Sequence, residues 1–249
     1  MKKSASVDVI GAACKDYVAK GKAADIVVRS SINEESIIPV SYLFRKFAEM
    51  PEIEHIALAA CKGKVLEIGA GVGSHALELQ SRNMKVVALD NSQGCCEVAM
   101  ARGVKNFICQ EFRDTIEGRF DTILMMMNGI GVCGTVAGLQ EFLERAKGLL
   151  NENGEIIFDS CDILYMFLEE DGSIDFDLNG SYYGEVEYQM SYKKNKGESF
   201  KWLFIDEDKM REIAENHGYH FTLLLKEDGG MYLGELKISS KLSRKNKEN

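Results

Sequence analysis

Short apolar runs alternate with amphipathic segments through the middle of the chain. The apolar runs cover residues 64–68, 85–89, 106–109, 121–127 and 155–158, and helical periodicity covers residues 74–82, 93–102 and 139–150. Continuous apolar runs of this length are typical of strands buried on both faces, and strands that alternate with helices form parallel sheets. The pattern therefore predicts an α/β domain with a mainly parallel sheet between layers of helices.

The N-terminal part of the chain has helical periodicity in two segments. Residues 5–20 place apolar side chains along one face, and residues 41–61 do the same with a break at Met50-Pro51. The break is expected because proline does not continue a helix interior. We therefore expect a cap of helices at this end of the chain.

The pattern loosens again after Asp162. Two pairs of apolar runs predict β-hairpins within residues 186–205 and 219–238, and Asp206 is a suitable N-cap for a helix between them. The chain is thereby divided into a helical cap over residues 1–60 and a domain over residues 61–249, which contains a ligand-binding half over residues 64–160 and a hairpin insertion at about residues 165–205.

The most informative segment joins the first apolar run to the helix after it. Glycines at 69, 71 and 73 follow the strand, so the backbone can turn tightly and approach a ligand where any Cβ would block it. The N-terminus of the next helix offers free N–H groups. Asp90 ends the second strand, 19 residues after Gly71, where a carboxylate can accept hydrogen bonds from both hydroxyls of an adenosine ribose. This arrangement predicts a site for an adenosine-containing cofactor.

Two cofactor classes share this arrangement. The letters from Gly69 to Ser74 nearly satisfy the dinucleotide pattern GxGxxG, which keeps a flavin- or nicotinamide-dependent oxidoreductase as an alternative. Two features argue against a dinucleotide cofactor: the third glycine stands at position 73, and Glu67 lies two residues before the first glycine. An acidic side chain beside the loop suits a cationic amino group and repels a pyrophosphate.

Residues 64–160 resemble the class I S-adenosylmethionine-dependent methyltransferases. Glu67–Gly73 matches the glycine-rich motif of that family, the run ending at Asp90 matches its second strand, and Gln110-Glu111-Phe112 occupies the place of its adenine-binding segment with Glu instead of Asp. The resemblance implies a Rossmann-like, seven-stranded, mainly parallel sheet flanked by helices, and S-adenosylmethionine as cofactor. The cofactor-binding residues that it implies are Glu67, Gly69, Ala70, Gly71, Gly73, Asp90, Asn91, Glu111, Phe112 and Asn128.

The reaction that the resemblance implies is SN2 transfer of a methyl group. The loop after the fourth strand begins with Asn128 and is not the Asn-Pro-Pro-Tyr signature of nitrogen-base methyltransferases, so we expect O- or N-methylation of a small molecule. Candidate catalytic residues are His75, beside the glycine loop, Asn128, and Asp159 and Asp162, which follow the fifth strand. Each also has a structural interpretation, as a core histidine, a turn residue or a helix cap, and a protein that binds the cofactor without turnover remains a second alternative.

Composition narrows the choice of partners. The net charge of −9 disfavours nucleic acid, and no stretch approaches the about 20 apolar residues that a membrane span needs. The seven cysteines form no CxxC pair and no histidine stands at ligand spacing, so we expect reduced thiols in the cytoplasm and no metal. Aromatic residues in the insertion are suited either to a substrate site or to a homodimer contact.

Overall fold

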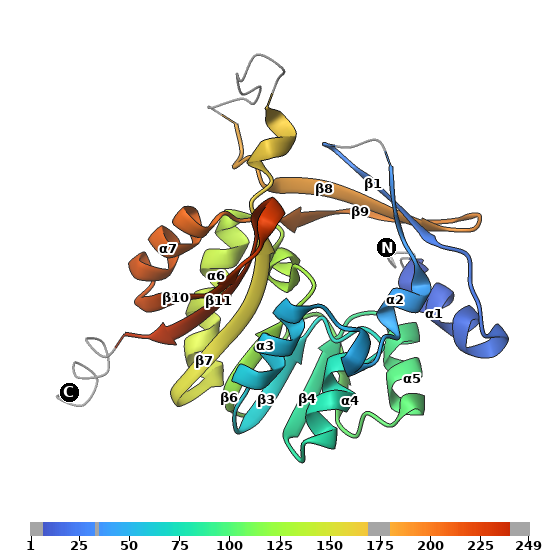
Figure 1. Cartoon of the computed structure of the whole chain (residues 1–249), viewed down its shortest axis with the longest axis horizontal. Helices are drawn as coiled ribbons and strands as arrows, with labels where there is room; N and C mark the ends of the chain where they lie inside the picture. The colour runs from blue at the N-terminus through green and yellow to red at the C-terminus, as the bar shows by residue number, and fades with distance from the viewer. Residues whose placement is uncertain (1–6, 33–34, 169–179, 240–249) are drawn as a thin grey trace, which may run out of the picture.

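The computed structural model describes residues 7–32, 35–168 and 180–239, and its centre is a seven-stranded sheet (Figure 1). The strand order is β10-β11-β7-β6-β3-β4-β5, and β11 runs in the opposite direction to the other six strands. The strands are β3 (Lys64–Ile68), β4 (Lys85–Asp90), β5 (Phe107–Cys109), β6 (Phe120–Met125), β7 (Leu150–Cys161), β10 (Tyr219–Lys226) and β11 (Met231–Ile238). The predicted Rossmann-like fold is thereby confirmed.

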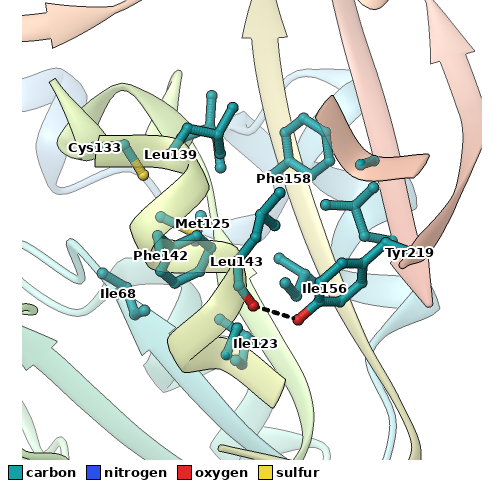
Figure 2. Packing of buried hydrophobic residues seen from close by; sticks show 14 of the residues in the cluster. Ile68, Ile123, Met125, Cys133, Leu139, Phe142, Leu143, Ile156, Phe158 and Tyr219 are labelled. Atoms are coloured by element: carbon teal, nitrogen blue, oxygen red, sulfur yellow. Dashed lines mark hydrogen bonds between the residues drawn. The ribbon is translucent and has the colours of Figure 1, made fainter. Parts of the chain in front are cut away.

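Helices cover both faces of this sheet because its central strands are apolar on both sides. One face packs against α3 (Glu52–Ala60), α4 (Ser74–Ser81) and α5 (Gln93–Arg102), and the other against α6 (Val136–Leu149) and α7 (Glu207–Asn216). Figure 2 shows the α6 side, where Phe142 and Leu143 pack on Ile123 and Ile156. The buried Tyr219 hydroxyl donates a hydrogen bond to the Leu143 carbonyl at 2.8 Å, so its polar atom is satisfied within the core.

A second, smaller sheet combines strands from the N-terminal part of the chain with strands from the insertion. Its order is β2-β1-β8-β9, all antiparallel, with β1 (Ile26–Ser30) and β2 (Ser36–Ile38) from the N-terminal part and β8 (Glu185–Tyr192) and β9 (Asn195–Leu203) from the insertion. In Figure 1, β8 and β9 run across the top of the view, above the end of β7. The predicted insertion hairpin is present, and residues 169–179 of the insertion lie outside the described residues.

The N-terminal 60 residues are not wholly helical, in contrast to the expected helical cap. Helix α1 (Val9–Lys20) is present, but the segment after it forms β1 and β2. The expected helical zone over residues 41–61 is divided into α2 (Val40–Leu43), a 3-10 turn at Phe47–Glu49 and α3, which begins directly after Pro51. The sequence did not predict these strands because β1 is stabilised by pairing with β8, about 160 residues away. A local pattern does not indicate such a distant pairing.

Helix α1 is fixed against α5 by one carboxylate. Asp8 accepts hydrogen bonds from the Gly11 N–H at 2.8 Å and the Gly94 N–H at 2.7 Å, so it caps both helices. A Cβ on Gly11 would lie 2.6 Å from the Gly94 Cα, which shows that the two helices cross in backbone contact. This crossing holds the N-terminal part beside the end of β4.

Within the described ranges, no helix combines the length and the apolar character needed to cross a membrane.

Candidate active site

The glycine loop leaves an open cradle after β3. Gly69 and Gly71 have φ angles of +75° and +51°, and a Cβ built on either would meet no atom of the described residues within 4 Å. Gly73 differs, because its Cβ would lie 2.5 Å from Val104 Cγ2. The first two glycines therefore keep space free for a ligand, whereas the third allows close packing of the helix. Ala70, the remaining predicted residue of the loop, donates its N–H to the Leu89 carbonyl at 3.0 Å.

The structure brings the residues predicted for the ribose and adenine to one edge of the sheet. Asp90 accepts hydrogen bonds from the N–H groups of Gly71 and Ser92, both at 2.8 Å. Beside it, the Asn91 amide donates to Glu111 Oε1 at 2.9 Å, which joins the ends of β4 and β5. Burial raises the pKa of Asp90, and the two N–H donors oppose this shift. Asp90 thus holds the glycine loop in addition to its predicted role.

Phe112 lies deeper than the exposed Glu111. It is 5% exposed and belongs to the core on the α6 side, where its ring centroid lies 6.2 Å from that of Phe142. The Arg113 guanidinium covers the ring at 4.7 Å. Phe112 is therefore part of the core, and its contact with the adenine ring stays a prediction.

We expect Asp90→Ala to weaken S-adenosylhomocysteine binding by about 1–3 kcal/mol, because the ribose hydroxyls and the Gly71 N–H lose a charged acceptor. Calorimetry on the folded variant measures this change. Asp121→Ala is the matched control: its carboxylate accepts from the Lys64 N–H at 2.7 Å, where β3 begins, at the end of the strand away from the glycine loop. Equal losses in the two variants would remove Asp90 from the cofactor site.

A chain of buried charges leads away from the glycine loop. Glu67 Oε1 lies 3.1 Å from His75 Nδ1, and His75 Nε2 lies 2.8 Å from Glu54 Oε2. The other oxygen of Glu54 accepts a hydrogen bond from the Arg45 guanidinium. All four side chains are buried, and Glu67 Oε2 has no hydrogen-bond partner within the described part of the chain. The sequence placed His75 near the cofactor, but it held no sign of the partner on α3.

Burial disfavours the charged form of His75, but the carboxylates of Glu54 and Glu67 outweigh it and raise the pKa of His75 to about 9. Because the folded-state pKa is raised, the stabilisation is fully present below the unfolded pKa of about 6.5 and is lost as the pH rises through about 9. We expect the difference in unfolding free energy between wild type and His75→Gln to shrink over this range. Urea titrations at several pH values measure it, and a constant difference would contradict the assignment.

The loop after β6 has an unusual backbone. Met127 and Asn128 have successive φ angles of +66° and +54°, a conformation that non-glycine residues adopt at a cost. Asp159 Oδ1 accepts from the Gly129 N–H at 3.1 Å, and the Asn128 backbone N–H also faces this carboxylate. Burial raises the pKa of Asp159 to about 6, although these N–H donors lower it. Asp159 thus holds the backbone of this loop in place through hydrogen bonds.

Asn128 connects this loop to the smaller sheet. Its amide Nδ2 lies 3.3 Å from the Leu203 carbonyl at the end of β9, while its buried Oδ1 has no hydrogen-bond partner in the residues that the structure describes. A Cβ on Gly131 would overlap the Trp202 indole, so β9 packs directly on the loop backbone. The insertion therefore contacts the edge of the sheet at which Glu67 and Asn128 lie.

Asp162 lies in a different environment from Asp159. It is partly exposed, and its Oδ1 accepts from the Tyr183 hydroxyl at 2.8 Å and the Leu164 N–H at 2.9 Å. Tyr183 also lies 3.2 Å from Asp206 Oδ2, the N-cap of α7. The sequence did not indicate this contact between Asp162 and the insertion, because Asp162 and Tyr183 are 21 residues apart and share no periodic pattern.

The comparisons with known proteins agree with this geometry. A family model described as a methyltransferase domain matches residues 65–154. The crystal structure of a SAM-dependent methyltransferase from Bacteroides fragilis, in complex with S-adenosyl-L-homocysteine, is 39% identical and has a TM-score of 0.87, with 93% of this chain and 95% of that chain covered. No curated protein matches the chain.

More distant structures share the fold alone. An S-adenosylmethionine-dependent methyltransferase from Clostridium acetobutylicum is 14% identical, with a TM-score of 0.55 and coverage of 80% of this chain and 98% of that one. The CcbJ methyltransferase from Streptomyces caelestis is 11% identical, with a TM-score of 0.58 and coverage of 78% and 95%.

The site fits S-adenosylmethionine in its own chemistry. The cradle at Gly69 and Gly71 is open, the Asp90 carboxylate lies beside it and accepts from the Gly71 N–H, and the Glu67 oxygen that has no partner among the described residues suits a cationic amino group. Among the described residues, no three His, Cys, Asp or Glu side chains come together to hold a metal ion. The site and the 39% identity over 93% of the chain lead to one conclusion: this chain belongs to the class I S-adenosylmethionine-dependent methyltransferases and uses S-adenosylmethionine as its cofactor.

Proposed function

We propose that the chain transfers a methyl group to an oxygen or nitrogen atom of a small molecule that binds between the carboxyl edge of the large sheet and the smaller sheet. The observation that carries this proposal is the smaller sheet itself. Both outer parts of the chain contribute strands to it, and β9 contacts the loop after β6 through Trp202 and Leu203. Because the smaller sheet covers this edge, the site is better suited to a small acceptor that it can enclose than to a macromolecule.

S-adenosylmethionine supplies a methyl group on a sulfonium, so the chain needs to align the acceptor and remove a proton from it. Alignment falls to the loop after β6, which Asp159 holds from beneath and Asn128 ties to β9. Because these contacts fix Asn128 and Gly129, the loop presents a rigid surface to the acceptor.

Asp162 is the group best placed to accept the proton. It follows β7 at the carboxyl edge, is partly exposed and is oriented by Tyr183 and the Leu164 N–H. Burial raises the pKa of Tyr183 further above its ordinary value, which keeps its hydroxyl protonated as a donor. Asp159 is less suited to this role, because backbone donors already occupy its buried carboxylate.

The net charge of −9 supports a small acceptor over nucleic acid, since phosphate backbones are bound by basic surfaces. The test is S-adenosylhomocysteine formation with a cell extract divided by ultrafiltration. We expect the filtrate, which holds the small molecules, to support turnover. Turnover with the retained macromolecules alone would overturn the proposal, and no turnover with either fraction would favour a cofactor-binding protein without catalysis.

A further inference from the structure

The proposed transfer step gives no role to the buried chain of charges that runs from Glu67 through His75 and Glu54 to Arg45. His75 lies between two carboxylates, with Nδ1 3.1 Å from Glu67 Oε1 and Nε2 2.8 Å from Glu54 Oε2. A neutral imidazole has one N–H and one bare nitrogen, so one ring nitrogen would face a carboxylate without a proton between them. The geometry therefore requires a proton at both contacts, as an imidazolium between two carboxylates provides.

The charges of this cluster are balanced when both acids are ionised. The cations of His75 and Arg45 offset the carboxylates of Glu54 and Glu67, all within a buried layer between the sheet and α3 and α4. Glu67 uses Oε1 for His75, which leaves Oε2 as a buried acceptor without a partner among the described residues. A buried acceptor of this kind is available to a donor from a ligand.

We propose that His75 is a positioning residue for the cofactor: as an imidazolium it orients Glu67 and balances its charge, so that the free carboxylate oxygen receives the amino group of S-adenosylmethionine. Without His75, the Glu67 carboxylate would be buried with no cation against it, and burial favours the protonated acid. The amino group would then have to displace a proton in order to bind.

The same chain joins the N-terminal part to the cofactor site. Arg45 donates to the Tyr42 carbonyl at 2.5 Å and lies 3.7 Å from the centre of the Tyr42 ring. The Ser74 hydroxyl, one residue before His75, donates to the Leu43 carbonyl at 2.7 Å. The segment around α2 is therefore fixed to the helix that carries His75, which makes the orientation of Glu67 depend on the docking of the N-terminal part.

The test compares two ligands on wild type and His75→Asn. Asparagine can keep an N–H donor toward Glu67 but has no charge. S-adenosylhomocysteine carries the amino group, whereas 5′-methylthioadenosine shares the adenosine and thioether and lacks the amino-acid portion. Between about pH 6 and 8, we expect the affinity of His75→Asn for S-adenosylhomocysteine to rise with pH more steeply than that of wild type, by up to tenfold per pH unit, with proton release in calorimetry. Its affinity for methylthioadenosine should show no added slope.

Other titratable groups face this cluster, and wild type supplies the baseline for them. Burial raises the pKa of Asp159 to about 6, with a contribution from Glu54, and raises the pKa of Asp90, with a contribution from Glu67. Burial also raises the pKa of Cys61, beside Glu67, to about 12, so this thiol stays neutral over the range. Protonation changes at Asp159 and Asp90 occur in both wild type and His75→Asn. The test therefore uses only the difference between the two proteins in the slope of affinity against pH.

Two further measurements make the outcome decisive. Glu67→Gln should remove the preference for S-adenosylhomocysteine over methylthioadenosine at every pH, which separates a failure at His75 from a failure of the cofactor site. Wild type labelled with ¹⁵N-histidine should show His75 protonated on both ring nitrogens at about pH 8, well above the ordinary pKa of about 6.5. A neutral His75 at that pH, or equal slopes for both ligands in His75→Asn, would overturn the proposal.

Discussion

Gly71→Val is expected to reduce binding of S-adenosylhomocysteine more than 100-fold, which corresponds to a loss of about 3 kcal/mol. A Cβ on Gly71 meets no protein atom within 4 Å, so the valine side chain would occupy the open cradle in place of the ligand. The fold itself should lose about 1–2 kcal/mol, because a β-branched residue is strained at a φ of +51°. Calorimetry and urea unfolding measure the two effects separately.

Gly21→Val is the matched control for this strain. Gly21 ends α1 with a φ of +69°, and its Cβ would likewise meet nothing within 4 Å. It lies at the far end of α1 from Asp8 and the α5 contact, so we expect a similar loss of stability with unchanged ligand affinity. If both variants bound the ligand normally, the glycine loop would not be the cofactor cradle.

Asp159→Ala is expected to lower kcat by about 30- to 100-fold. The variant removes a buried acceptor from two backbone N–H groups, at about 1–1.5 kcal/mol each, and releases the strained segment Met127-Asn128. Affinity for S-adenosylhomocysteine should change only a few-fold, because Asp90, the predicted ribose acceptor, lies on another strand. Turnover is followed as S-adenosylhomocysteine release with the active extract fraction.

Asp159→Asn separates the loop-holding role from proton transfer. Asparagine keeps one oxygen that can accept from the Gly129 N–H, so we expect it to retain more of the turnover than Asp159→Ala. If asparagine were as damaging as alanine and the pH profile lost a limb near pH 6, Asp159 would be the base and the role given to Asp162 would fall.

Local patterns were sufficient for the cofactor half of the fold. Helix α5 begins and ends at the predicted residues, 93 and 102, because Ser92 caps it and Gly103 ends it in a left-handed conformation. Outside the cofactor half, the hairpin of β10 and β11 also spans the predicted residues, 219–238. Each of these elements carries its start and stop signals within a few residues, so sequence alone defines them.

Elements that depend on distant partners were missed or left ambiguous. The strand β1 is stabilised by β8, on the far side of the whole cofactor half. Asp159 and Asp162 looked equivalent in sequence, yet Asp159 lies within β7, which is buried on both faces there, whereas Asp162 follows the last residue of β7 and lies at the rim beside Tyr183. His75 acquires its charge from Glu54, 21 residues earlier on a separate helix. Such contacts are tertiary, and no local period encodes them.

The most direct test of the whole account follows the methyl group itself. Wild type is incubated with S-adenosylmethionine that carries a ¹³C-labelled methyl group and with the small-molecule fraction of an extract, and the products are observed by carbon NMR and mass spectrometry. We expect one labelled methyl on a small molecule, with the chemical shift of an O- or N-methyl group and with no such product from Gly71→Val. Label found in macromolecules, or on a carbon or sulfur atom of the product, would contradict it.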